Sequence, residues 1–277
     1  MRFATLVKPL LFAALLVGDG VAEAATTPRQ VLEASPIDDI VAQYPAMMSR
    51  GIRQGLQQND QVPAVVADAI GQVVSSSIRA EDIEQRILDD LGRSLSAEQL
   101  QSVQDWYETP LAGKLSRAEI AASAPSVWPK IRQQAPALNK RFEGTDRAKL
   151  FDRFDRASRA TESAVDTAVA LQLSLASAMS ALNGDDSSAA QTRQRIESQR
   201  GVLQGVVGQQ VYDSYLYTYQ NFSNQELKLY LDFLESDAGS AFTRVVTRSI
   251  QQAITEPVDN IGAQIARFLN PALSGGQ

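Results

Sequence analysis

Apolar side chains recur at helical spacing along most of the chain, and capping residues and prolines separate the periodic stretches. Ile83, Ile87 and Leu91 lie on one side of a helix, with polar residues between them. The stretch 164–182 is rich in alanine and apolar on most sides, which predicts a buried central helix. A long helix is predicted for 190–219 and an amphipathic one near 258–268. The pattern therefore predicts an all-α protein.

One pattern of apolar and polar positions occurs twice, 127 positions apart. Its first copy covers 95–100 and 105–110, and its second covers 222–227 and 232–237. A repeat of this length predicts two related halves, each a helical unit with apolar surface to bury. The prolines at 125, 129 and 136 are expected to break the chain after the first half. We therefore expect two tandem helical-bundle repeats, 25–141 and 142–277.

Each copy combines a capping box, a short helix with an aromatic residue near its end, and a cap for the next helix. The residues of this motif are Ser96, Gln99, Trp106, Tyr107, Thr109 and Pro110 in the first copy, and Ser223, Glu226, Phe233, Ser236 and Gly239 in the second. Such a motif predicts a tight corner between two helices with the aromatic side chain packed in the angle. The alternative is that Trp106, Tyr107 and Thr109 contact a ligand. Leu234 replaces the phenol of Tyr107 in the second copy, which favours packing.

The motif resembles the DUF2059 family. The family pattern is an aromatic residue, a Ser/Thr cap, Glu-Leu, and then Phe-Tyr-x-Thr/Ser-Pro-x-Gly. The first copy has Trp106-Tyr107 and Thr109-Pro110 but places Ala112 where the second copy has Gly239. The second copy keeps that glycine and has Asp237 in place of the usual proline. The resemblance implies an exported helical protein of Gram-negative bacteria and brings no activity with it.

The amino terminus predicts export. Arg2 and Lys8 are followed by an apolar run at 10–17 and by the small-x-small pattern Ala22-Glu23-Ala24. This order is typical of a signal peptide, here 1–24, and the run is too short to span a bilayer. A retained membrane anchor is the alternative. We therefore expect a periplasmic protein whose mature chain begins near Ala25.

Composition excludes several kinds of chemistry. The chain has no histidine and no cysteine, so zinc, copper and non-haem iron sites and Ser-His-Asp or cysteine nucleophiles are not expected. We predict no metal and no cofactor. The formal net charge of −6 argues against nucleic acid as a partner.

Two groups of side chains are candidates for binding. Tyr212, Tyr215 and Tyr219 cluster near the end of the predicted long helix, where tyrosines either bind sugars and peptides or form half-buried core. Arg153 and Arg156 belong to a basic segment, 130–159, which either binds an acidic partner or pairs with its own acidic residues.

The function that these features favour is non-enzymatic binding in the bacterial envelope, with another envelope protein or the cell-wall polymer as partner. One alternative is an envelope glycan hydrolase or lyase that uses Asp and Glu, which requires two carboxylates roughly 5–10 Å apart in a cleft. A second alternative is a peripheral membrane-associated scaffold that contacts lipid through the segment 130–159. A deep groove with paired carboxylates would favour the enzyme, and a broad apolar or tyrosine-lined surface would favour binding.

Overall fold

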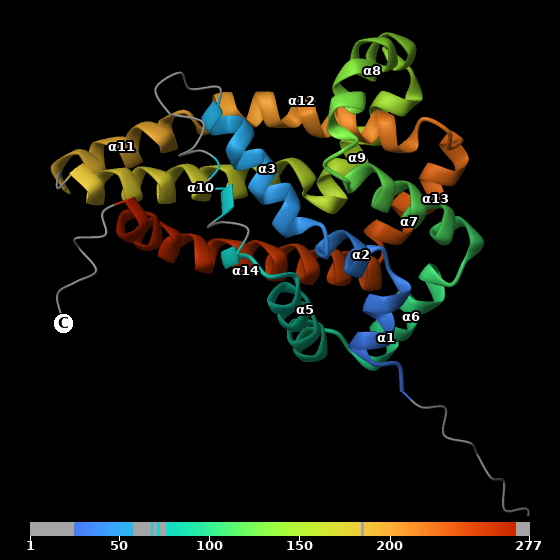
Figure 1. The fold of residues 1–277 in the computed structure, drawn as a ribbon. Helices are drawn as coiled ribbons and strands as arrows, with labels where there is room; N and C mark the ends of the chain where they lie inside the picture. Colours follow the sequence, from blue (N-terminus) through green and yellow to red (C-terminus); the bar gives the residue numbers. More distant parts are fainter. Residues whose placement is uncertain (1–24, 58–67, 69–70, 73–75, 184–185, 270–277) are drawn as a thin grey trace, which may run out of the picture.

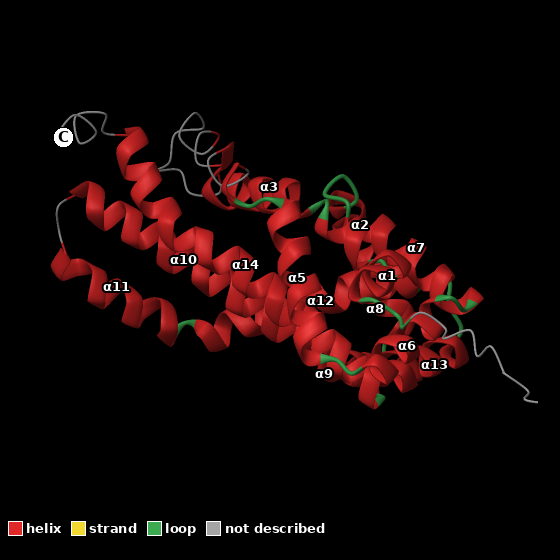
Figure 2. Cartoon of the chain, turned by 90° about the horizontal axis from the view of Figure 1, so that it is seen from below, coloured by secondary structure: helices red, strands yellow, loops and turns green. Residues whose placement is uncertain are grey.

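The structure, a computed structural model, describes residues 25–57, 68, 71–72, 76–183 and 186–269. The expected signal peptide, 1–24, lies outside these residues. Figures 1 and 2 show helices joined by short loops, and the described part of the chain contains no strand. The helices are α1 (Pro28–Ala34), α2 (Ile37–Val41), α3 (Tyr44–Gln57), α5 (Ala80–Ser94), α6 (Ala97–Tyr107), α7 (Pro110–Ser123), α8 (Trp128–Phe142), α9 (Asp146–Ser158), α10 (Ala160–Asn183), α11 (Asp186–Ser198), α12 (Arg200–Tyr219), α13 (Asn224–Glu235) and α14 (Asp237–Leu269). The all-α prediction is confirmed.

Helix α10 lies at the centre of the long helices. It packs against α12 on one side and α14 on the other, and α14 packs in turn against α5 (Figure 1). Val165 and Val169 of α10 are buried with Val207 of α12 in a small apolar cluster. No helix among the described residues is both long and apolar enough to cross a membrane.

The main hydrophobic core includes residues from both predicted halves. It extends from Val31 and Leu32 of α1 to Ile254 of α14, and Ile83, Ile87 and Leu91 of α5 are fully buried within it. The side of α5 predicted from its apolar spacing is therefore the side that faces the core.

The two helix corners form at the predicted residues. Ser96 and Ser223 each accept a hydrogen bond from the third residue of their helix, while Gln99 and Glu226 bond back to the backbone N–H of the cap residue. The next helices, α7 and α14, begin one residue after Thr109 and Ser236. These capping boxes satisfy N–H groups that the first helical turn leaves free, which explains why each helix begins where it does.

The two corners are built from the same hydrogen bonds. The Thr109 hydroxyl donates to the carbonyl of Trp106 at 2.7 Å and accepts from the N–H of Ala112 at 3.1 Å. The Ser236 hydroxyl donates to the carbonyl of Phe233 at 2.6 Å and accepts from the N–H of Gly239 at 3.1 Å.

The second corner is the tighter of the two. A Cβ added to Gly239 would lie 2.0 Å from the carbonyl oxygen of Phe233, too close for any side chain, so this corner requires glycine. Ala112 is accommodated in the first corner, where it is buried.

Two expectations from the sequence differ from the structure. Pro136 does not end a helix but lies inside α8, and the chain turns at Glu143–Thr145, where Gly144 has a φ of +68°. The long helix expected over 190–219 is divided at Gln199 into α11 and α12. At this break the Ser198 hydroxyl bonds back to the carbonyl of Arg195, a contact that bends helices, whereas Gly201, Gly205 and Gly208 lie within α12.

Candidate functional site

Three tyrosines of α12 point toward α9. Because Tyr212, Tyr215 and Tyr219 are three and four residues apart, they share one side of the helix. Tyr212 and Tyr215 pack on the ring of Phe151 with ring centroids 4.8 and 5.3 Å apart, and Phe154 packs on Tyr215 and Tyr219. Tyr215 and Tyr219 are 4% and 3% exposed, so their hydroxyls lie inside the protein, whereas Tyr212 is half-buried.

A carboxylate from α7 lies among these rings. The Tyr219 hydroxyl donates to Glu119 Oε1 at 2.6 Å, and Tyr230 of α13 hydrogen-bonds the same carboxylate. Burial raises the pKa of Glu119, and the two tyrosine hydrogen bonds offset part of that shift. Burial also raises the pKa of Tyr219 and Tyr230 well above 10, and the negative charge of Glu119 adds to the shift. Both tyrosines are therefore neutral donors at physiological pH.

An apolar pocket of 410 Å³ opens beside this carboxylate. Trp128, Ile131, Phe154, Ala164, Val207 and Val211 form much of its wall, so α8, α9, α10 and α12 all contribute. Glu119, Tyr215 and Tyr219 add polar groups to an otherwise mostly apolar lining. Within the described residues the buried Tyr215 hydroxyl has no hydrogen-bond partner. Pockets of this size with few polar groups are typical of small-molecule sites.

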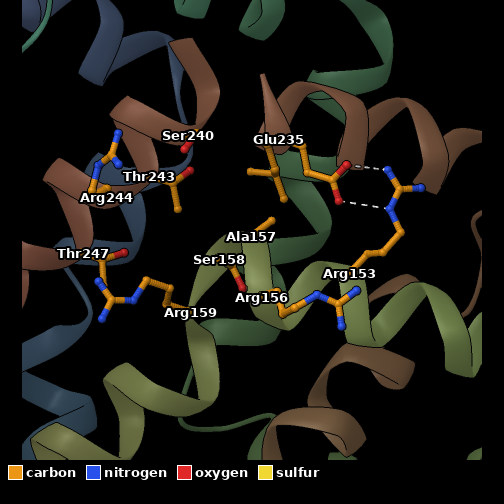
Figure 3. A pocket seen from close by; sticks show the side chains of 11 residues that line it. Arg153, Arg156, Ala157, Ser158, Arg159, Glu235, Ser240, Thr243, Arg244 and Thr247 are labelled. Atoms are coloured by element: carbon orange, nitrogen blue, oxygen red, sulfur yellow. Dashed lines mark hydrogen bonds and ion pairs between the residues drawn. The ribbon is translucent and has the colours of Figure 1, made fainter. Parts of the chain in front are cut away.

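The arginines predicted to bind lie elsewhere, in a second pocket between α9, α13 and α14 (Figure 3). Arg153 donates to Glu235 from Nε at 3.0 Å and from Nη2 at 2.6 Å, and also to Asp232, so its charge is paired with acidic residues of α13 at the surface. These bonds raise the pKa of Arg153 and lower that of Glu235. Arg156 makes no such pair and is exposed. The two arginines that the sequence grouped together thus line one pocket, but only Arg153 forms ion pairs.

The motif residues lie at the contact between the two helix corners. Trp106 stacks on Phe233 with ring centroids 4.7 Å apart and an interplanar angle of 8°, and Tyr107 meets Phe233 edge-on. Trp106 is half-buried and Phe233 is buried. Both aromatic residues therefore pack against protein.

Sequence reasoning did not assign Glu119 or Trp128, both of which line the apolar pocket, to any site. Glu119 lies four residues after Leu115, which itself lies three after Ala112, so the carboxylate falls on the buried side of α7. A single acidic residue on the apolar side of a predicted helix is visible in the sequence, so the pattern of α7 contains a signal for Glu119. Nothing in the sequence around Trp128 indicates that it lines a pocket together with residues of α12.

Metal-ligand groupings are absent from the parts of the chain where side chains are described. No group of three or more Asp or Glu residues there is close enough to hold an ion. The polar groups of the apolar pocket suit hydrogen bonding to an organic molecule.

Comparison with known proteins gives one match. Residues 81–141 match a family described as "Uncharacterized protein conserved in bacteria (DUF2059)". This segment runs from α5 to the end of α8 and contains the first copy of the motif, so the resemblance to the family is confirmed there. The second copy lies outside the matched residues. No curated protein and no solved structure matched the chain.

Proposed function

We propose that this protein is an exported, non-enzymatic binding protein of the bacterial envelope, and that the apolar pocket beneath α12 holds its ligand. The observation that carries the proposal is the chemistry of this pocket, whose lining is mostly apolar and contains one acidic residue, Glu119. The ligand class is a small molecule with an apolar body and one hydrogen-bonding group.

Binding is favoured over glycan hydrolysis by the placement of the carboxylates. Glu119 is the one acidic residue in the described lining of the apolar pocket, so it has no second carboxylate with which to share acid and base roles. Glu162 and Asp166 do lie together in another pocket, but Arg159 and Arg200 pair with them. The hydrogen bond from Arg159 lowers the pKa of Glu162, whereas a general acid needs a raised pKa.

Titration with the fluorescent apolar amine 1-N-phenylnaphthylamine tests the pocket. We expect saturable binding that Ala164→Trp abolishes, because an indole at this position fills the cavity. Val202→Trp is the matched control, since Val202 is 73% exposed on the same helix as the tyrosines. Equal binding by the two variants, with unchanged helical circular dichroism, would exclude the pocket.

The role of the Glu119 carboxyl is tested with a pair of probes. Glu119→Leu should weaken binding of 2-naphthol relative to that of naphthalene by about fivefold, the worth of one hydrogen bond. The hydrolase alternative predicts that the full-length protein releases soluble fragments from purified peptidoglycan. Such release, lost in Glu119→Gln, would replace the binding proposal.

Export is supported by the charged start, the apolar run at 10–17 and Ala22-Glu23-Ala24. Osmotic shock of the host should release a chain that begins near Ala25. Recovery of the full-length chain from the cytosol would contradict export and leave the pocket proposal intact.

We also propose that the two motif copies belong to related halves paired about a local two-fold axis. In a two-fold contact, equivalent residues meet each other and cross contacts occur in both directions. Trp106 meets its equivalent, Phe233. Gln99 donates to Asp237 of the second corner at 2.8 Å, and Lys114 near the first corner donates to Glu226, the equivalent of Gln99, at 2.7 Å.

An exchange of the two rings tests this axis. Trp106→Phe combined with Phe233→Trp should keep the stacked pair and unfold within about 1 kcal/mol of wild type, as volume-conserving swaps do. Phe233→Trp alone should destabilise more, because it adds volume at the axis. A double variant as unstable as the sum of the two single ones would argue against the axis.

A further inference from the structure

The second pocket, between the end of α9 and the start of α14, has a different chemistry from the apolar one. Its volume is 350 Å³, and four arginines and one glutamate are among its lining residues. Arg153 is paired with Glu235, and Arg159 with Glu162. Arg156 and Arg244 make no ion pair and no hydrogen bond with any described residue. Two guanidinium groups at one pocket of a chain whose net charge is −6 thus lack a hydrogen-bonded acceptor, although the charge of Arg156 helps to lower the pKa of Glu235.

Hydroxyl groups complete the lining. Ser240, Thr243 and Thr247 lie on the side of α14 that faces the pocket, and Figure 3 shows them beside Arg244, with Arg156 and Arg159 on the α9 side. Their hydroxyls have no hydrogen-bond partner among the described residues. Many serine and threonine hydroxyls inside the helices of this protein bond back to a carbonyl one turn earlier, as Thr218 of α12 and Thr255 of α14 itself do. The three in the pocket are therefore free to donate to a ligand.

The backbone brings these donors together in two ways. Arg159 ends α9 with a left-handed backbone, φ 54° and ψ 31°, so the chain turns sharply between α9 and α10 at the pocket. Ser236 starts α14 at a defined residue, which places Ser240 near the end of its first turn and Arg244 one turn further along the same side. The amino-terminal end of a helix carries a partial positive charge, which adds to the field of the arginines.

From these observations we infer that the pocket is a binding site for a phosphate-type oxyanion. Guanidinium and hydroxyl donors line the pocket from both sides, and its one carboxylate, Glu235, is already held by Arg153, so the free donors match the acceptor-only surface of a phosphate group. The ion pairs Arg153–Glu235 and Arg159–Glu162 border the site and leave Arg156 and Arg244 available for the ligand. The phosphate can come from a small soluble molecule or from a phospholipid head group, and the two sources present the same chemistry. This site is separate from the apolar pocket and does not depend on the function proposed for it.

The test uses the full-length protein, with pyrophosphate followed by calorimetry and vesicles containing phosphatidylglycerol followed by co-sedimentation. Arg156→Ala/Arg244→Ala should weaken binding by roughly tenfold or more, because it removes both free charges. Arg117→Ala/Lys140→Ala is the matched control, since it removes two exposed charges on α7 and α8. Thr247→Val, which removes a hydroxyl and keeps the shape, should weaken pyrophosphate binding several-fold.

Each outcome decides the proposal. Pyrophosphate binding lost in the arginine variant supports the site with a soluble ligand. Binding to the vesicles but not to pyrophosphate, again lost in the arginine variant, supports the site and identifies a lipid head group as its ligand. This outcome would also support the membrane-associated alternative. All variants carry the same amino-terminal segment, 1–24, so any binding of this segment to the vesicles is equal in all of them and does not affect the comparison. No binding to either probe, or equal losses in the arginine variant and the control, would overturn the site.

Discussion

Arg147 connects the carboxyl-terminal end of α12 to the start of α13, although it belongs to the basic segment that the sequence presents as surface. It is 4% exposed. Its guanidinium donates to the carbonyls of Tyr219 and Phe222 and to the side chain of Asn224. Burial lowers its pKa, yet arginine stays charged at any physiological pH. A cation at this end of a helix satisfies carbonyls that the helix leaves free.

Replacing this residue tests its structural role. Arg147→Met keeps the apolar stem and removes the donors, which leaves two buried carbonyls unpaired. We expect the free energy of unfolding to fall by about 2–4 kcal/mol, as measured in urea. Arg117→Met, at an exposed position of α7, should change it by less than about 0.5 kcal/mol. Similar effects of the two changes would show that Arg147 is not part of the core.

At the scale of elements, the capping boxes of α6 and α13 do more than start their helices. Glu226 accepts from the N–H of Ser223 at 2.7 Å and from Lys114 of α7 at 2.7 Å, so one carboxylate joins the start of α13 to another helix. The hydrogen bond from Lys114, followed by those from Ser223, lowers the pKa of Glu226 to about 2.

The acid dependence of stability follows from this pKa. Because the pKa of Glu226 in the folded protein lies below its ordinary value of 4.5, the contribution of this carboxylate is complete above that value. It is lost as the pH falls toward about 2. Melting temperatures between pH 5 and 2 should therefore drop less steeply in Glu226→Gln than in wild type. Lys114→Met should flatten the same range, and an unchanged slope in both variants would contradict the assignment.

At the scale of the whole molecule, the main core joins helices from α1 to α14, and the repeat does not divide it. Trp106 packs on Tyr230 and Phe233, and the buried core residues of α5 lie in the same cluster as those of α12, α13 and α14. The aromatic side chains of the first corner are therefore covered by those of the second, and the reverse.

One cooperative unfolding transition is therefore expected. Both tryptophans, Trp106 and Trp128, lie in the first half of the chain, whereas circular dichroism at 222 nm reports all the helices. The urea midpoints obtained from tryptophan fluorescence and from circular dichroism should coincide. A second transition seen by circular dichroism alone would show that the two halves unfold separately.

Local interactions explain which features were predictable. The capping boxes at Ser96 and Ser223, the corners at Thr109 and Ser236, and the buried side of α5 depend on residues within a few positions of each other, so their pattern can be recognised in the sequence. The break at Gln199 was not predicted, because Gly201, Gly205 and Gly208 are the obvious weak points of that segment, and all three lie within α12. Pro136 is tolerated in α8 and did not mark a boundary.

The sequence by itself determined the helical class, the start of each corner and the absence of imidazole and thiolate chemistry, since composition and short-range spacing are sufficient for these. Tertiary structure decided which side chains form sites. Glu119 meets Tyr219 across 100 positions, and Arg153 finds its acceptors on α13 while Arg156 does not. Such contacts join helices far apart in the chain, and hydrophobic periodicity shows which side of a helix is buried without showing which helix will cover it.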